Sequence, residues 1–492
     1  MISHRIAKTL SNWGDDPLVL HAGRWSAGKV IAELAIRVAG LVDAAAGNPD
    51  EAVCFVIRNR PAHLAALLGL VAAGRPIRLV NAFQSPEKII RDLDGLDARL
   101  VVADRDDRAV LAGRGGAVIL GALSAETFGT SDHDCGPCLH DVAIELTTSG
   151  TTGTPKRIGL SPSTLLAAID DQARIAAEMG EAPPGRHLEA ALIQYAPILH
   201  IAGLWTALQM GMEGRRLVLL EKFDAAQWVS AVKMLRLRMT GMSPPLLRMV
   251  LDLGPPPQDL ASLVAIRCGS TALDVDTRDA FTARYAIPLL GVYGATEYAG
   301  VVASWSLADH HGFAATKSTS AGRLRGHVAE ARVADPIDGH ILPLGECGVL
   351  ELRVPRVGEE WMRSSDLASI DSDGFLTLYG RTDSAIIRGG FKILPDQLVE
   401  ILRRHDAVVD AVVVGLPDRR LGQIPAAAVE LRGGAQVTEA DIDRYMRDQV
   451  SAYQVPVRYR IVDRLPRTPS AKIILTEVVA LFSDREPLPS DQ

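Results

Sequence analysis

The sequence predicts an α/β protein with a large N-terminal domain of helix-covered sheets and a small α+β C-terminal domain. The chain has 492 residues, more than one hydrophobic core usually supports. Segments of helical period alternate with short apolar runs over its first part, as in parallel sheets covered by helices. Beyond Asp383 this character changes. We therefore predict domains at residues 1–382 and 383–492.

Individual elements follow from the period of the apolar residues. Segments of helical period are residues 30–46 and 62–73. Short apolar and branched runs predict strands at residues 52–57, 99–103, 117–120, 142–146, 217–220, 264–267 and 287–290. In the C-terminal part, the predicted strands are residues 408–414, 426–431 and 457–462.

Composition and charge argue against several classes of partner. The hydrophobic fraction is 48%, the charged fraction is 23% and the net charge is −7, so a nucleic-acid-binding surface is not expected. No apolar run reaches the roughly 18 to 20 residues of a membrane span, and the first residues lack the apolar core of a secretory signal. We expect a cytoplasmic protein without a membrane partner; its assembly stays open, a homodimer included.

The chain has five cysteines, an odd and small number for its length. They favour a reducing compartment over a disulfide framework. Cys135 and Cys138 form a Cys-Gly-Pro-Cys segment that matches a redox motif, and His133 and His140 are conceivable zinc ligands. The segment does not open a helix, and no second ligand pair has suitable spacing. A surface loop is therefore the favoured interpretation.

A loop rich in hydroxyls and glycines follows the predicted strand at residues 142–146. Glycines allow a sharp turn that exposes backbone N–H groups, the hydroxyls donate to phosphate oxygens, and Lys156 adds a charge-assisted bond. A P-loop is excluded, because Pro155 and Arg157 stand where that motif needs glycine and Ser/Thr. The candidate phosphate-binding residues here are Thr148, Ser149, Gly150, Thr151, Thr152, Gly153, Thr154 and Lys156.

The order Thr-Ser-Gly-Thr-Thr-Gly-Thr-Pro-Lys resembles the signature loop of the adenylate-forming superfamily, which includes acyl-CoA synthetases, nonribosomal-peptide adenylation domains and beetle luciferases. The segment from Tyr293 to Glu297 resembles a second signature block. Tyr293 and Gly294 are candidates for the adenine site, Thr296 for bonding a phosphate, and Glu297 for holding Mg2+. Gly269 and Ser270 are further ATP-binding candidates by the same resemblance.

Three later blocks complete the resemblance, which extends from about residue 53 to residue 473. Asp366 matches the carboxylate that accepts bonds from both ribose hydroxyls, and Arg381 matches the ribose-contacting arginine. Asp383 matches the hinge of a mobile C-terminal domain. Lys472 matches the catalytic lysine of adenylation, whose ammonium stabilises charge shifting between acid and phosphate.

Two residues depart from the family pattern. Arg157 replaces the glycine usual after the loop lysine, and it either adds a cation near the phosphates or points to solvent. Ala471 replaces the glycine usual before the catalytic lysine, which removes backbone freedom from the segment that presents Lys472.

The expected substrate is a hydrophobic carboxylic acid, with cyclic and aromatic acids among the candidates. His200 matches the family residue beside the carboxylate pocket, and residues 199–208 contain no acid to pair with an amino-acid ammonium. The resemblance also brings small, largely uncharged residues to the acyl pocket: Ser243, Gly269, Ser270, Thr271, Ala299, Gly300 and Val301. Past the hinge, Arg388, Gly389 and Gly390 are candidates for contacting CoA.

The resemblance implies an AMP-forming acid–thiol ligase, most like an acyl-CoA synthetase, that uses ATP, Mg2+ and CoA. A stand-alone ligase that loads a carrier protein is the first alternative. A nucleotide-binding regulatory protein is the second, because Arg157 and Ala471 depart from the pattern.

Overall fold

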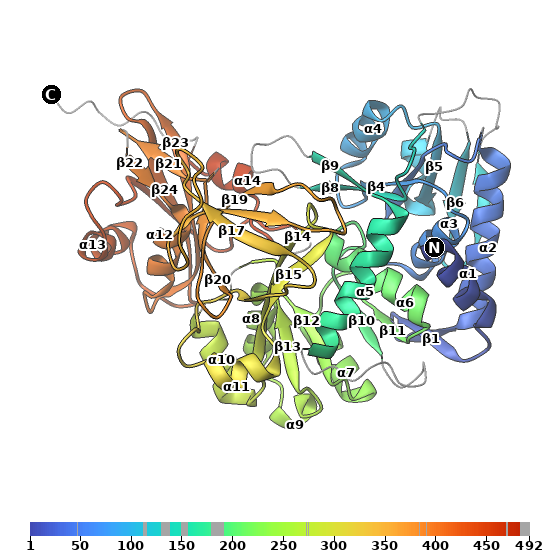
Figure 1. Ribbon diagram of the computed structural model, residues 1–492, viewed down its shortest axis with the longest axis horizontal. Coiled ribbons are helices and arrows are strands. Elements are labelled where there is room, and N and C mark those ends of the chain that lie inside the picture. Colours follow the sequence, from blue (N-terminus) through green and yellow to red (C-terminus); the bar gives the residue numbers. More distant parts are fainter. Residues whose placement is uncertain are drawn as a thin grey trace. The chain divides into compact units, whose positions relative to one another are not determined.

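The computed structural model describes residues 1–46, 48–111, 116–128, 138–148, 156–178, 191–271, 273, 275–382, 384–389, 391–468 and 471–482. It divides into two compact units. The first unit comprises Met1–Ser318, Arg325–Ala329 and Val354–Glu359, and the second comprises Thr319–Leu324, Glu330–Arg353 and Glu360–Gln492 (Figure 1). The predicted boundary at Asp383 does not coincide with this division and stays a prediction.

The largest sheet of the first unit has the strand order β7-β6-β5-β3-β4-β8-β9. Its strands are β3 (Val53–Ile57), β4 (Ile77–Asn81), β5 (Leu100–Asp104), β6 (Ala117–Leu120), β7 (Ala125–Phe128), β8 (Ile144–Thr148) and β9 (Lys156–Leu160). The inner strands are parallel, whereas β7 and β9 are antiparallel to their neighbours. Every residue of β3 is buried, as expected for a parallel strand with both faces covered.

Two smaller strand groups complete the sheets of the first unit. One has the order β10-β11-β1-β2, from β1 (Pro17–His21), β2 (Arg24–Ala27), β10 (Leu192–Gln194) and β11 (Leu217–Leu219). The other runs β12-β13-β14-β15, from β12 (Met239–Met242), β13 (Ala265–Cys268), β14 (Leu289–Ala295) and β15 (Gly300–Ser304).

Helices cover these sheets. They are α1 (Ile2–Asn12), α2 (Gly28–Ala45), α3 (Pro61–Ala72), α4 (Pro86–Gly95), η1 (Arg105–Leu111), α5 (Pro162–Glu178), α6 (Ile201–Glu213), α7 (Ala225–Leu235), α8 (Pro244–Leu253), α9 (Pro257–Leu260), α10 (Val275–Tyr285) and α11 (Leu307–Phe313). Helix α3 is buried along almost its whole length, because it packs against α1, α2 and α6 within the main core. A helix enclosed in this way is apolar on every side.

The second unit contains an antiparallel strand group and a smaller α+β group. The first has the order β16-β20-β19-β18-β17, from β16 (Gly322–Leu324), β17 (Glu330–Ala334), β18 (Gly348–Arg353), β19 (Met362–Ile370) and β20 (Phe375–Arg381). The second comprises β21 (Ile386–Arg388), β22 (Phe391–Ile393), β23 (Val408–Asp418), β24 (Gly422–Leu431), β25 (Arg458–Val462), α12 (Pro395–Arg403), α13 (Glu439–Gln449) and α14 (Leu475–Ala480).

The predicted fold class is confirmed. Helices at residues 30–46 and 62–73 correspond to α2 and α3, and the strand at residues 117–120 is β6. The sheets are mixed rather than purely parallel. The strand predicted at residues 287–290 ends too early. Strand β14 continues to Ala295, because it pairs with β15 there.

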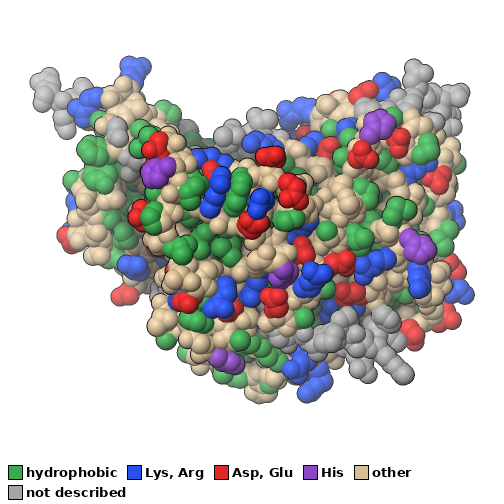
Figure 2. All heavy atoms as spheres, in the orientation of Figure 1, with side chains coloured by type: hydrophobic (Ala, Val, Ile, Leu, Met, Phe, Trp, Pro, Cys, Tyr) green, Lys and Arg blue, Asp and Glu red, His purple; other side chains and the backbone are tan. Residues whose placement is uncertain are grey.

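The surface carries mixed charges on the face shown in Figure 2, where acidic and basic side chains are interspersed. A membrane-crossing helix is absent from the described part of the chain, since none there combines the required length with sufficient apolar character.

Candidate active site

Two of the phosphate-binding candidates, Thr148 and Lys156, lie on paired antiparallel strands. Thr148 ends β8 and lies opposite Lys156, which begins β9 with an exposed side chain. The other predicted residues of this loop lie outside the described residues: Ser149, Gly150, Thr151, Thr152, Gly153 and Thr154. Cys135 and His133 of the predicted surface loop also lie outside them.

Arg157 neither points freely to solvent nor stands unpaired beside the loop. Its Nη1 donates to Oε1 of Glu145 at 2.9 Å, and both side chains are largely shielded from solvent. Nε of Arg78 approaches the same carboxylate oxygen at 3.6 Å. The Arg157 guanidinium is therefore held by a carboxylate on the neighbouring strand, an outcome that sequence analysis did not consider.

The second signature block forms a hairpin turn between β14 and β15. Tyr293 and Gly294 lie within β14, whereas Thr296 and Glu297 lie in the turn that follows it. The backbone N–H of Ala299 donates to the carbonyl of Thr296 at 3.0 Å and closes this turn. Glu297 is exposed and forms no ion pair with a described residue, so its carboxylate is available to a cation.

Arg356 holds this hairpin in place through hydrogen bonds to its backbone. Its Nε donates to the carbonyl of Tyr298 at 3.0 Å and its Nη2 to that of Val301 at 3.1 Å. Its Nη1 pairs with Asp171 of α5 at 2.9 Å, and the arginine side chain is only 2% exposed. Burial lowers the pKa of Arg356, and Asp171 opposes that effect. Sequence analysis missed Arg356, because no local pattern marks a lone arginine whose partner is 185 residues away.

The acyl-pocket candidates from other segments are all present in the first unit. His200 is half-buried at the N-terminus of α6, and Ser243 is buried at the N-terminus of α8. The Ser243 hydroxyl has no hydrogen-bond partner among the described residues. Gly269 packs against β14, since a Cβ there would lie 2.6 Å from Cγ2 of Val292. Ser270 and Thr271 follow it with exposed side chains.

Tyr195 is a half-buried residue near Ser243 that sequence analysis did not identify. Burial raises the pKa of its hydroxyl well above the usual range, whereas a backbone hydrogen bond from Ser243 lowers it. The phenol therefore stays protonated and lies in the same region as the buried thiol of Cys268. A lone tyrosine in an apolar stretch gave no signal of this position.

The two ribose candidates lie next to each other in the second unit. Asp366 on β19 is the direct cross-strand partner of Arg381 on β20. Nη2 of Arg381 donates to Oγ of Ser365 at 2.5 Å. The hydroxyl of Thr382 donates to the Ser365 carbonyl at 3.1 Å, which ties the end of β20 to β19.

Asp396, in the first turn of α12, is a carboxyl beside this pair that the sequence did not reveal. Burial raises its pKa, and Asp366 adds to that rise while Arg403 and Arg381 oppose it. Gly380 must be glycine here, because its φ is +110° and a Cβ would lie 2.8 Å from Oδ2 of Asp396. The predicted hinge residue Asp383 lies outside the described residues.

Lys472 is exposed on a short hairpin that is closed by backbone hydrogen bonds. Its N–H donates to Oγ1 of Thr468 at 3.1 Å, and the N–H of Thr468 donates to its carbonyl at 2.7 Å. Arg467 donates to the Ala471 carbonyl at 3.1 Å and forms a short bond to Asp410 of β23. Ala471 has a φ of +63°, the left-handed conformation that glycine adopts most easily.

The CoA candidates are partly committed to contacts within their own unit. Nη1 of Arg388 donates to the carbonyl of Tyr453 at 2.7 Å, and the N–H of Gly389 donates to the Leu421 carbonyl at 2.8 Å. The remaining nitrogens of Arg388 are the part of that residue left for a ligand. Gly390 lies outside the described residues.

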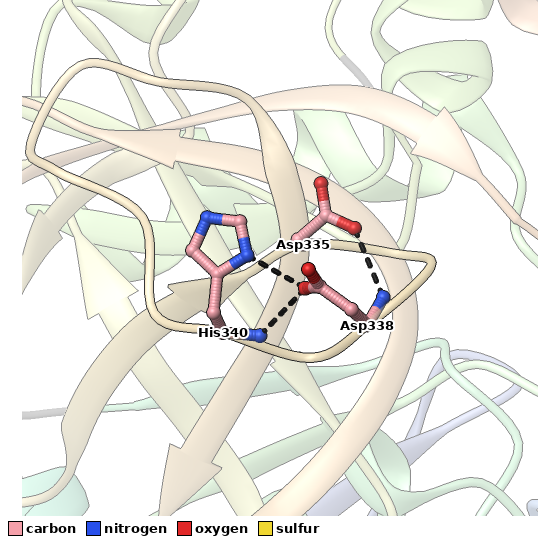
Figure 3. A group of neighbouring side chains, drawn as sticks. All are labelled: Asp335, Asp338 and His340. Atoms are coloured by element: carbon pink, nitrogen blue, oxygen red, sulfur yellow. Dashed lines mark hydrogen bonds and ion pairs between the residues drawn. The ribbon is translucent and has the colours of Figure 1, made fainter.

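A group of three potential metal-binding side chains lies in the turn between β17 and β18. Figure 3 shows that Asp335, Asp338 and His340 bond to one another within the turn. Nδ1 of His340 lies 2.6 Å from Oδ1 of Asp338, and the N–H of Asp338 donates to Oδ1 of Asp335 at 3.1 Å. These bonds stabilise the turn, and the hydrogen bond to Asp338 raises the pKa of His340.

Comparisons with known proteins give relatives that cover from 69% to 94% of this chain. The 4-coumarate–CoA ligase-like 5 of Oryza sativa subsp. japonica is 30% identical over 349 residues, which cover 69% of this chain and 62% of that protein. The fatty acid–acyl-carrier-protein ligase ScoC of Streptomyces coeruleorubidus is 27% identical over 490 residues, which cover 94% of this chain and 92% of that protein. The chain spans 62% to 65% of the lengths of three plant relatives.

Solved structures share the fold described above for this chain. ATP-bound MatB from Rhodopseudomonas palustris superimposes with a TM-score of 0.80 at 22% sequence identity, covering 98% of this chain and 99% of that one. Residues 6–361 match the family model described as AMP-binding enzyme, and residues 400–472 match the one described as AMP-binding enzyme C-terminal domain. The chain therefore belongs to the AMP-binding enzyme family, the adenylate-forming superfamily whose signature blocks its sequence carries.

Proposed function

We propose that this protein is an ATP-dependent carboxylic acid:CoA ligase that activates a hydrophobic acid as an acyl-adenylate and releases AMP and pyrophosphate. One observation supports this most strongly. The ribose candidates Asp366 and Arg381 lie side by side, and the same compact unit presents Lys472 on a hairpin fixed by its own hydrogen bonds. Relatives at 27% to 30% identity include CoA ligases, which agrees with the proposed class of reaction.

The proposed reaction has two steps. First, a carboxylate oxygen of the acid bonds to the α-phosphorus of ATP, and pyrophosphate leaves with the electron pair of the broken P–O bond. Lys472 would stabilise the negative charge on the oxygens that share this transition state. Second, the sulfur of CoA bonds to the acyl carbon, the thiol proton passes to solvent, and AMP leaves with the electron pair of the broken acyl C–O bond.

Magnesium fits the turn after β14. An exposed carboxylate without an ion pair among the described residues suits Mg2+, which is usually held by one or two carboxylates together with substrate phosphates. Glu297 would hold the ion, with Thr296 bonding a phosphate beside it. When bound, the ion would neutralise phosphate charge, while Tyr293 and Gly294 of the same hairpin would contact the adenine.

The remaining roles are proposed from the resemblance. The glycines and hydroxyls at residues 148–154, together with Lys156, Gly269 and Ser270, would bind ATP. His200, Ser243, Thr271, Ala299 and Gly300 would line the acid site. Asp383 would be the hinge between half-reactions, and Arg388, Gly389 and Gly390 would contact CoA.

A carrier protein is the second candidate acceptor, favoured by one specific observation. The carrier-protein ligase ScoC aligns with 94% of this chain and is itself covered over 92% of its length. The two candidates share the adenylation step and differ only in the thiol that receives the acyl group.

Product analysis by mass spectrometry tests the proposal. The purified protein is incubated with ATP, Mg2+ and a panel of aliphatic, alicyclic and aromatic acids, each with and without CoA. We expect acyl-CoA only when CoA is present, with AMP released in step. Acyl-adenylate that never reaches CoA would favour the carrier protein, and no turnover with any acid would contradict the ligase assignment.

A further inference from the structure

Two side-chain N–H groups converge on Gly300 in the first unit. Nε2 of Gln172 on α5 and Nε1 of Trp205 on α6 each lie 3.1 Å from the place where a Cβ of residue 300 would stand. Gly300 begins β15, directly after the turn that carries Thr296 and Glu297. Because residue 300 has no side chain, both nitrogens face its backbone with no side chain of that residue between them.

Both nitrogens are buried, and neither has a hydrogen-bond partner among the described residues. Buried polar atoms are nearly always paired, so two such atoms at one point call for an explanation. The indole N–H of Trp205 can only donate, whereas the Gln172 amide can present either its NH2 or its oxygen. The missing partner is therefore a hydrogen-bond acceptor.

The local charges favour an uncharged acceptor. The cation nearest to this point is Arg356, whose Nη2 lies 3.8 Å from the same Cβ position. The Arg356 nitrogens already donate to Asp171 and to two backbone carbonyls. The carboxylate of Asp171 balances the buried charge of this guanidinium. A second carboxylate brought here would be a buried anion without a cation of its own.

We propose that Trp205 and Gln172 determine specificity by donating to a neutral acceptor oxygen, such as a ketone or amide carbonyl, in the acyl part of the acid. This inference rests on the proposed ligase function, because it concerns the same acid site. It narrows the expected substrate from any hydrophobic acid to a hydrophobic acid that carries one uncharged acceptor. An acid of matching shape without the oxygen leaves both donors buried and unpaired.

Matched pairs of acids test the proposal. The probes are 5-oxohexanoic and hexanoic acids, 4-oxocyclohexanecarboxylic and cyclohexanecarboxylic acids, and 4-acetylbenzoic and 4-ethylbenzoic acids. AMP release at low acid concentration gives kcat/KM for each. We expect wild type to prefer the oxo acid by about 10-fold or more in at least one pair, since one buried hydrogen bond is worth roughly that ratio.

Two variants assign that preference to the donors. Trp205→Phe and Gln172→Met keep apolar bulk but remove one N–H donor each, so each should reduce the oxo preference to about 3-fold or less, mainly by slowing the oxo acid. Trp228→Phe is the matched control, because Nε1 of Trp228 is also buried and unpaired among the described residues but lies on α7. The control should retain the wild-type preference.

A binding measurement supplies a readout that does not depend on turnover. The chain has six tryptophans, and the indole N–H signal lost in Trp205→Phe identifies Trp205 in a 15N-labelled sample. The preferred oxo acid should move that signal downfield, and its partner without the oxygen should not.

The inference is overturned if every pair that turns over favours the acid without the oxygen, or if Trp205→Phe keeps the oxo preference. In both cases turnover itself leaves the ligase function standing. Absence of AMP release with all six acids, together with an unmoved Trp205 signal, would overturn the inference and the proposed function together.

Discussion

Lys472 is the residue on which adenylation is expected to depend most. Replacing it by alanine should lower acyl-adenylate formation by about 100-fold or more, the usual effect of removing one group that stabilises transition-state charge. Thioester formation from a supplied acyl-adenylate should be nearly unchanged. The two half-reactions are measured separately, with Glu477→Gln, an exposed charge change nearby, as the control. Equal losses in both steps would contradict the assigned role.

Ala471 is held in a backbone conformation that suits glycine. Because an L-residue with positive φ is strained, Ala471→Gly should stabilise the hairpin by about 0.5 to 1 kcal/mol. Hydrogen exchange of the Ala471 and Lys472 amides, both bonded to Thr468, should slow correspondingly. Unchanged or faster exchange would show that the alanine imposes no strain. Thr468→Val, which removes the acceptor for Lys472, is the opposite control and should speed exchange at that amide.

At the scale of elements, the pair of Asp171 and Arg356 joins α5 to the β14–β15 hairpin. Asp171→Ala leaves a buried guanidinium without its carboxylate, so we expect a loss of about 3 kcal/mol or more in unfolding free energy. The double variant Asp171→Asn, Arg356→Gln removes both charges and should be less destabilised than Asp171→Ala. Urea unfolding compares them, and a double variant that is the least stable would contradict the charge-burial argument.

Asp410 joins β23 to α12 and to the Lys472 hairpin. Burial tends to raise its pKa, but Arg403 and Arg467 lower it below the ordinary value of 3.8. A lowered folded-state pKa gives stabilisation that is complete above the unfolded-state value and is lost as the pH falls through the folded-state value. The stability gap between wild type and Asp410→Asn should therefore be constant near neutral pH and shrink below pH 3.8.

That gap is measured by urea unfolding of both proteins across the acidic range. A stability gap between the two proteins that stays constant down to pH 3, or that widens there, would contradict the assigned pKa direction. The change in the gap must exceed the error of linear extrapolation to zero urea. Arg432→Gln is a suitable control, because Arg432 lies in the same unit and bonds to a backbone carbonyl instead of a carboxylate.

The sequence predicted elements best where local pattern and packing agree. Residues 30–46 and 62–73 carry a helical period, and α2 and α3 pack against each other in the main core. Strand β14 was predicted too short because glycines interrupt its pattern, and only pairing with β15 continues it. Short-range pattern could not supply that pairing, since it depends on a partner strand.

For the whole molecule, the family blocks gave the identity of candidate residues but little of their surroundings. Asp366 and Arg381 were predicted individually, and their cross-strand pairing follows from the register of β19 and β20. For Arg157 the sequence allows two roles, and in the structure its guanidinium pairs with Glu145. Arg356, Asp396 and Tyr195 escaped prediction, because their environment is made by segments distant in the sequence.

The most direct test of the account is acid-dependent exchange of radiolabelled pyrophosphate into ATP in the absence of CoA. The exchange reports reversible acyl-adenylate formation regardless of which thiol follows. Wild type should show exchange with every acid that yields a thioester, and Lys472→Ala should lose it. Formation of acyl-CoA from an acid that supports no exchange, or exchange that persists undiminished in Lys472→Ala, would contradict the account.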